Sequence, residues 1–189
     1  MQQLDLSVFY FLHGFAGQST FLDWAIIIIG EYSLYGYIVL IGYLMYRLYY
    51  TKRLQEIVLY ILVFVSAFIA RFVVAELIRL FYHHLRPFVA LHFIPLLGHE
   101  TSYSFPSGHT IFFFSVATAL LFVNKRLAYA TYLLGFVVGI ARVVAGVHYP
   151  SDIVGGIVLG VLSGYMFYQI LYYVLHGIRP EMSPSQNIH

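Results

Sequence analysis

The fold is decided by a run of 25 residues from Ile57 to Phe81, which reads IVLYILVFVSAFIARFVVAELIRLF. A helix of this length rises about 38 Å, enough to cross the roughly 30 Å hydrocarbon core of a bilayer. The charged residues within the run are Arg71, Glu76 and Arg79. We interpret the run as a transmembrane helix, and each of these charges needs a partner or a function because charge inside a membrane is costly.

Four further apolar runs cover most of the chain, at about Leu22–Tyr46, Thr110–Val123, Leu127–Val147 and Ile153–Leu175. The sequence is 61% hydrophobic and 10% charged, with a mean hydropathy of +0.82, whereas soluble domains carry about 25% charged residues. The run Thr110–Val123, third in the order of the chain, is short unless it begins at Ser107. These features predict an all-α, polytopic transmembrane helical bundle of about five spanning helices.

We expect a single membrane-embedded domain over residues 1–189. Segment 1–20 has no Lys or Arg before its apolar stretch, so we expect an interfacial N-terminal helix there rather than a cleavable signal peptide. Residues 177–189 are polar and are expected to form a cytoplasmic tail. The apolar face of the N-terminal helix would consist of Val8, Phe9, Phe11, Leu12 and Phe15.

The positive charge predicts how the chain is oriented, because Lys and Arg concentrate in cytoplasmic loops. In a five-span topology, one side receives Arg47, Lys52, Arg53, Lys125, Arg126 and Arg179. We expect that side to be cytoplasmic in the cell (inner or plasma) membrane. The scattered basic residues and a net charge of +2 give no sign of a nucleic-acid partner, and the absence of cysteine excludes disulfides. The oligomeric state stays open.

Arg79 and Arg86 lie at the extracytoplasmic end of the second predicted helix, separated by six residues and followed by Pro87. Either arginine alone could simply snorkel to the headgroups. The segment Pro106–His109 opens the third helix, where Ser107 suits the N-cap and Gly108 lets a ligand approach the backbone. Free N–H groups and the helix dipole would attract an anion there, although an ordinary cap is the simpler alternative.

Arg142, His148 and Asp152 span the turn between the fourth and fifth helices. Asp152 stands at a helix start, where an acid is stabilised by the dipole. A carboxylate near an imidazole can also fix its tautomer and leave the other nitrogen able to attack. Both interpretations stay open, but all three segments fall on one membrane side and together supply what binding and transferring a phosphoryl group requires.

In order, Arg79-x6-Arg86-Pro87, Pro106-Ser107-Gly108-His109 and Arg142-x5-His148-x3-Asp152 resemble the three-part signature of the type 2 phosphatidic acid phosphatase superfamily, which is shared with vanadium-dependent haloperoxidases. The motifs and their helices cover about Ile57–Leu175. The resemblance implies that His148 attacks phosphorus to give a phosphohistidine, that Asp152 orients it, and that His109 protonates the leaving oxygen. It implies no metal and no cofactor. The phosphate would be held by Arg79, Arg86, Ser107, Gly108 and Arg142.

Two positions depart from the family pattern. Arg79 stands where Lys is usual, which keeps the charge but alters its reach. Ala141 replaces a common Ser before Arg142 and so puts one phosphate hydrogen bond in doubt.

The resemblance implies that the substrate is a membrane lipid phosphate or diphosphate. The stretch RPFVA at Arg86–Ala90, the pair Glu31–Tyr32 and the dipeptide His13–Gly14 before Leu22–Asp23 resemble the bacitracin-resistance type of undecaprenyl diphosphate phosphatase. Undecaprenyl diphosphate is therefore favoured, with hydrolysis at the extracytoplasmic face. Those enzymes often carry Asp where Gly108 stands, so phosphatidylglycerophosphate, phosphatidate and lipid A phosphate remain alternatives.

Other readings concern residues outside the motifs and functions outside phosphate hydrolysis. A vanadate-type oxidoreductase could use the same motifs, and a non-enzymatic anionic-lipid binder or transporter could use the arginines, although binding alone needs no nucleophile. Metal binding and interfacial solvation are alternatives for His83, His84, His92, His99 and Glu100, and headgroup contact is open for His99, Glu100 and Tyr103. Arg71 and Glu76 are expected to be paired within the bundle, with a role in substrate binding as the alternative.

Overall fold

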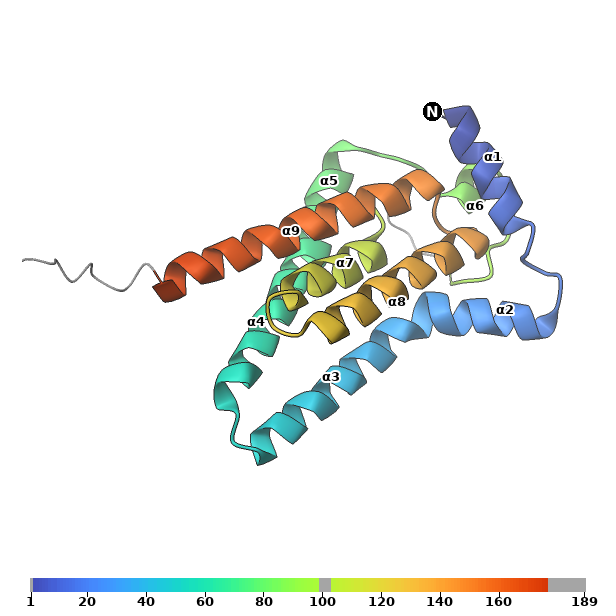
Figure 1. Ribbon diagram of the computed structural model, residues 1–189. Helices are drawn as coiled ribbons and strands as arrows, with labels where there is room; N and C mark the ends of the chain where they lie inside the picture. Colours follow the sequence, from blue (N-terminus) through green and yellow to red (C-terminus); the bar gives the residue numbers. More distant parts are fainter. Residues whose placement is uncertain (1, 99–102, 177–189) are drawn as a thin grey trace, which may run out of the picture.

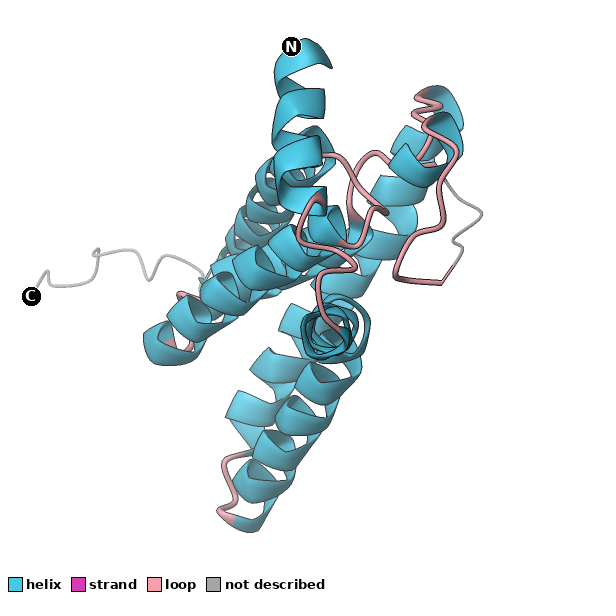
Figure 2. Ribbon diagram, turned by 90° about the vertical axis from the view of Figure 1, so that its right-hand side faces the viewer, coloured by secondary structure: helices cyan, strands magenta, loops and turns pink. Residues whose placement is uncertain are grey.

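The computed structural model describes residues 2–98 and 103–176, and within them the chain consists of helices and loops without strands (Figures 1 and 2). Four helical segments are long and apolar enough to cross a membrane: Thr20–Tyr50, Glu56–Phe81, Lys125–Val144 and Pro150–Tyr173. A fifth apolar helix, Gly108–Leu120, is shorter. The predicted all-α, polytopic transmembrane bundle is therefore confirmed.

Both long N-terminal segments contain one π-helical turn. The first is built from α2 (Thr20–Ile27), η1 (Ile28–Tyr32) and α3 (Ser33–Tyr50), and the second from α4 (Leu54–Ile69), η2 (Ala70–Val74) and α5 (Ala75–Phe81). The other helices are α1 (Gln2–His13), α6 (Pro87–Ala90), α7 (Gly108–Leu120), α8 (Lys125–Val144) and α9 (Pro150–His176). Single π-turns inside α-helices are frequent at functional sites, and both of these adjoin the site described below.

Helix α7 lies at the centre of the bundle, and all of its residues are buried. It packs most extensively against α9, whose Gly156, Gly160 and Gly164 face its backbone and side chains. A Cβ atom at Gly160 would lie 2.7 Å from the carbonyl oxygen of Ile111, so a larger residue would push the two helices apart. Ser107 is the N-cap of α7, as expected from the short apolar run, although the helix ends at Leu120 rather than Val123.

The turns that carry the basic residues lie at one end of the bundle. Figure 1 places the α3–α4 turn, the α7–α8 turn and the described end of α9 at the left, whereas the α8–α9 turn and the start of α7 lie toward the right. The segments with the phosphate motifs are thus at the end opposite Arg47, Lys52, Lys125 and Arg126. Arg179 and the tail lie outside the described residues.

Helix α1 is bound to the bundle more firmly than the expected interfacial helix. Phe9 is fully buried, and together with Leu12 it packs against Val143, Tyr149 and Ile153. The five residues expected to form the apolar face of α1 differ in burial. Phe9 and Leu12 face the bundle, while Val8, Phe11 and Phe15 are exposed.

Candidate active site

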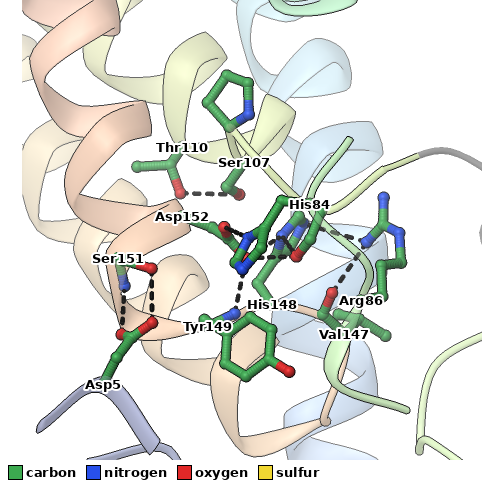
Figure 3. Close-up of polar contacts among 12 residues, drawn as sticks. Asp5, His84, Arg86, Ser107, Thr110, Val147, His148, Tyr149, Ser151 and Asp152 are labelled. Carbon is green, nitrogen blue, oxygen red and sulfur yellow. Dashed lines mark hydrogen bonds and ion pairs between the residues drawn. The ribbon is translucent and has the colours of Figure 1, made fainter. Parts of the chain in front are cut away.

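Segments far apart in the sequence meet where α8 passes into α9 (Figure 3). His84 and Arg86 follow α5, and Ser107 precedes α7. His148 comes from the α8–α9 turn, and Asp152 comes from the first turn of α9. Arg86, Ser107, His148 and Asp152 are all at most 1% exposed. Such complete burial of charged groups requires dense polar pairing.

The α8–α9 turn is shaped by local backbone rules. Helix α8 ends with Gly146 in the left-handed region, and the amides of Gly146 and Val147 donate to the carbonyls of Val143 and Arg142, the pattern of a Schellman cap. Pro150 opens α9, and the Asp152 carboxylate accepts from the Tyr149 amide at 2.7 Å. An acid in the third helical position that reaches back to the cap amide forms half of a capping box. These two caps hold His148 between the helices.

His148 and Asp152 form a carboxylate–imidazole pair. Nδ1 of His148 lies 3.4 Å from Oδ2 of Asp152, and Nε2 lies 3.4 Å from Nη1 of Arg86. With Nδ1 facing the carboxylate, the proton belongs on Nδ1 and the lone pair on Nε2. Burial, assisted by the charges of Arg142 and Arg86 and opposed by the bond to Asp152, lowers the pKa of His148 to about 4. The imidazole is therefore neutral near pH 7.

Ser104, which the sequence did not single out, and His84, whose role the sequence left open, also contact Asp152. Ser104 donates to Oδ2 of Asp152 and lies 3.4 Å from Nδ1 of His148. Nδ1 of His84 lies 3.2 Å from Oδ1 of Asp152, and this hydrogen bond raises the pKa of His84. The Ser104 amide also donates to the His84 carbonyl at 2.7 Å, which ties the two segments together.

Three of the predicted arginines reach the site in different ways. Arg79 is bonded to Glu76 at 2.6 Å and to the carbonyl of Pro106 at 2.9 Å, so α5 is tied to the start of α7. Arg86 donates to the carbonyl of Val147 at 3.0 Å. Arg142 is fully buried and directs Nη1 toward η1, where it meets the carbonyl of Gly30 at 3.0 Å and Glu31 at 3.4 Å. Opening of the helix at a π-turn makes such a carbonyl available.

The start of α7 borders a cavity of about 50 Å³. Ser107 does not use its side chain to cap the helix; instead its Oγ accepts from Thr110 at 3.1 Å, and its amide donates to the Asp152 carbonyl. The cavity is lined by Arg71, Phe72, Glu76, Arg79, Gly108, His109 and His148. Two imidazoles, two guanidiniums and a helix N-terminus thus share one small space.

The remaining polar residues fall into separate places. The ring of His83 lies 4.5 Å from the ring of Tyr103 between centroids, tilted by 30°. His92 is not among the residues that line the cavity. His99 and Glu100 lie outside the described residues. Within residues 2–98 and 103–176, no group of three His, Asp or Glu side chains is arranged to hold a metal ion.

Some of these contacts were visible in the sequence only as residue types. Ser104 stands next to the Phe-Pro-Ser-Gly-His stretch, and His84 stands two residues before Arg86, but neither spacing indicates a common carboxylate. Asp5 is more remote still: it accepts from both the amide and the hydroxyl of Ser151, at 2.9 and 2.7 Å, from a helix 146 residues away (Figure 3).

Comparison with known proteins agrees with this geometry. A sequence model of the PAP2 superfamily matches residues 57–175. The undecaprenyl-diphosphatase BcrC of Bacillus subtilis is 30% identical over 166 residues, which are 88% of this chain and 83% of that protein. The bacitracin transport permease protein BcrC of Bacillus licheniformis is 31% identical over 162 residues, 85% of this chain and 77% of that protein.

A solved structure agrees as well. The transmembrane PAP2-type phosphatidylglycerolphosphate phosphatase of Bacillus subtilis superimposes with a TM-score of 0.65 at 25% identity, covering 92% of this chain and 87% of that one. Motifs, fold and site therefore point the same way, and the chain belongs to the PAP2 superfamily as a multi-pass membrane phosphate hydrolase.

Proposed function

We propose that the chain hydrolyses the terminal phosphate of a membrane lipid phosphate or diphosphate, undecaprenyl diphosphate being favoured, through a phosphohistidine on His148. One observation carries the proposal: His148, held by Asp152 through Nδ1, lines the same cavity as His109 and Arg79. A nucleophile oriented by a carboxylate, with a second imidazole beside it, is the arrangement that two-step group transfer requires.

In the first step, Nε2 of His148 forms a bond to phosphorus while the bond from phosphorus to the bridging oxygen breaks. His109 gives its proton to that oxygen, and the lipid product leaves. Asp152 stabilises the positive charge that develops on His148. In the second step, water attacks phosphorus, His109 accepts a proton from it, and the N–P bond breaks. Inorganic phosphate is released and His148 returns to its neutral form.

The phosphoryl group needs positive charge around its three non-bridging oxygens, because the attacking nitrogen and the leaving oxygen lie on opposite sides of phosphorus. Arg79, Arg86 and Arg142, with the Ser107 hydroxyl and the Gly108 amide, would supply it as the group becomes planar. Support comes from Arg86, 3.4 Å from the attacking nitrogen, and from Gly108, whose lack of a side chain leaves the start of α7 open to the cavity. No step requires a metal ion or a cofactor.

The substrate and the side of action are inferred from the relatives and from charge. A diphosphatase that is 30% identical over most of both chains favours undecaprenyl diphosphate, and phosphatidylglycerophosphate, phosphatidate and lipid A phosphate are the alternatives. The basic turns at the opposite end of the bundle favour an active site that faces the extracytoplasmic side of the cell membrane.

Phosphate release from purified protein tests the proposal. Undecaprenyl diphosphate, phosphatidylglycerophosphate, phosphatidate and lipid A are offered in matched detergent micelles to the wild type, His148→Ala and Arg47→Gln. Arg47 is exposed at the far end of the bundle, so its variant is the matched control. We expect release by the wild type and the control, fastest from undecaprenyl diphosphate, and none by His148→Ala. A wild type that binds these lipids without releasing phosphate would instead favour a carrier.

A further inference from the structure

Arg71 belongs to the π-turn η2 and is one of the residues that line the cavity. It stands eight residues before Arg79, which at 1.5 Å per residue places it about 12 Å deeper along the helix. Both guanidiniums nevertheless line the same cavity, together with His109 and His148. A Cβ atom at position 108 would lie 3.6 Å from Nη1 of Arg71, so the guanidinium lies directly against the first residue of α7.

The cavity opens sideways, toward the surface that faces lipid. Phe72 is 55% exposed, the Glu76 side chain is 51% exposed, and both line the cavity. Leu77 and Val73, on the same stretch of helix, are also about half exposed. A lipid headgroup can therefore enter the cavity beside Phe72 and Glu76, while its chain stays on the exposed face of the continuous helix that η2 and α5 form.

This geometry orders the parts of a bound substrate. The phosphoryl group under attack must lie at His148, near Arg86 and Arg79. The leaving portion must then extend away from His148 toward the lipid side, where Phe72 and Arg71 stand. In a lipid monophosphate that portion is an uncharged alcohol after protonation. In a lipid diphosphate it is a second phosphate, which carries negative charge and matches a guanidinium.

We propose that Arg71 forms a second-phosphate subsite that selects lipid diphosphates over monophosphates by binding the phosphate that leaves with the lipid. The subsite rests on the proposed function, because it assigns the leaving side of the same reaction. Nε2 of His148 bonds to the terminal phosphorus, the bridging oxygen leaves with the inner phosphate and takes its proton from His109, and Arg71 holds that inner phosphate throughout. Glu76 pairs with Arg79 and compensates part of the positive charge of that guanidinium.

The test compares two substrates that share one chain, farnesyl diphosphate and farnesyl monophosphate. In Arg71→Gln we expect kcat/KM for the diphosphate to fall about 10- to 100-fold relative to that for the monophosphate, the loss expected for one charge-assisted partner. Arg71→Lys should restore part of the ratio, because charge returns without the planar fork. Arg79→Gln should lower both substrates together, and Arg47→Gln should change neither.

Binding gives a readout that does not depend on turnover. Calorimetry with inorganic diphosphate and with orthophosphate should show that Arg71→Gln loses the preference of the wild type for diphosphate, while the affinity for orthophosphate stays within about threefold. Equal losses on both substrates, or an unchanged preference in binding, would overturn the subsite. A wild type that releases phosphate from neither substrate yet binds diphosphate through Arg71 would overturn the proposed hydrolysis and leave the subsite standing.

Discussion

Asp152 serves the backbone and the chemistry with a single carboxylate. Oδ2 caps α9 through the Tyr149 amide, and it also lies 3.4 Å from Nδ1 of His148. The two interpretations that the sequence left open, helix cap and orienting acid, are both present in the geometry. Ser104 and His84 complete the bonding of this carboxylate, so its position is determined from four directions.

The low pKa of His148 has a consequence for the pH dependence of activity. The imidazole must be neutral to attack, and burial lowers its pKa to about 4. We expect the acid limb of kcat/KM to fall near pH 4 rather than near the usual value of about 6.5 for histidine. Because the unfolded chain binds this proton at the higher value, stability should also decline as the pH drops from about 6.5 toward 4.

A pH–rate profile from pH 3.5 to 8 on a lipid phosphate, with thermal unfolding followed over the same range, checks this expectation. An acid limb centred near 6.5 would show that His148 is not held in the neutral form by its surroundings.

The residues of the three motifs could be predicted because each segment has a distinctive order, and their convergence followed from counting spans. His84, Ser104 and Asp5 could not be predicted in the same way. His84 and Ser104 each contact one of the two carboxylate oxygens of Asp152, and Asp5 contacts the first turn of α9. Such contacts are set by tertiary packing rather than by local spacing. Arg71 was visible as a charge in an apolar run, but only the cavity showed which way it faces.

Among the helices, α1 contacts the α8–α9 turn, which carries His148, and the first turn of α9. Asp5 binds the first turn of α9 through Ser151, and Phe9 is buried against Tyr149. A carboxylate from another helix placed at a helix N-terminus favours that end electrostatically. The amphipathic pattern of segment 1–20 predicted a helix there. It did not predict the docking, because the docked face and the exposed face are both apolar.

Asp5→Ala should remove the hydrogen bonds that connect α1 to Ser151 at the start of α9. We expect a loss of stability of about 1 kcal/mol, typical of a lost helix cap. We also expect a several-fold lower kcat, because Asp5 holds the start of α9 and His148 lies two residues before Pro150, where that helix begins. Asp23→Ala is the matched control, since Asp23 accepts from the Gly17 amide at 2.8 Å far from the cavity. Thermal unfolding in detergent and phosphate release are measured on both variants. If kcat falls equally in the two variants, the contact between Asp5 and Ser151 does not determine the position of His148.

The two π-turns show where sequence patterns reach their limit. The long apolar runs predicted the spans around them, yet η1 and η2 shift the helix register by one residue where Gly30 meets Arg142 and where Arg71 meets Gly108. Propensity alone gives no signal for such a shift, because the wider turn is stabilised by its tertiary partners.

In the molecule as a whole, the basic residues of the turns lie apart from the residues of the candidate active site. The basic turns lie at one end and the phosphate site at the other (Figure 1), which predicts that the site faces outward. The chain has no native cysteine, so single cysteines can report on each side. Gly98→Cys should react with an impermeant thiol reagent added to intact cells, whereas Arg53→Cys and Lys125→Cys should react only after the membrane is opened. The reverse pattern would invert the proposed orientation.

The proposed mechanism transfers the phosphoryl group to His148, and the resulting phosphohistidine can be trapped covalently. Purified protein is mixed with a lipid diphosphate labelled with ³²P in the terminal phosphate, quenched in alkali to protect phosphohistidine, and digested for peptide mapping. We expect label on the peptide that contains His148 in the wild type, more label in His109→Ala because water attack is slowed, and none in His148→Ala. Label that maps to His109, or turnover that persists in His148→Ala, would contradict the mechanism.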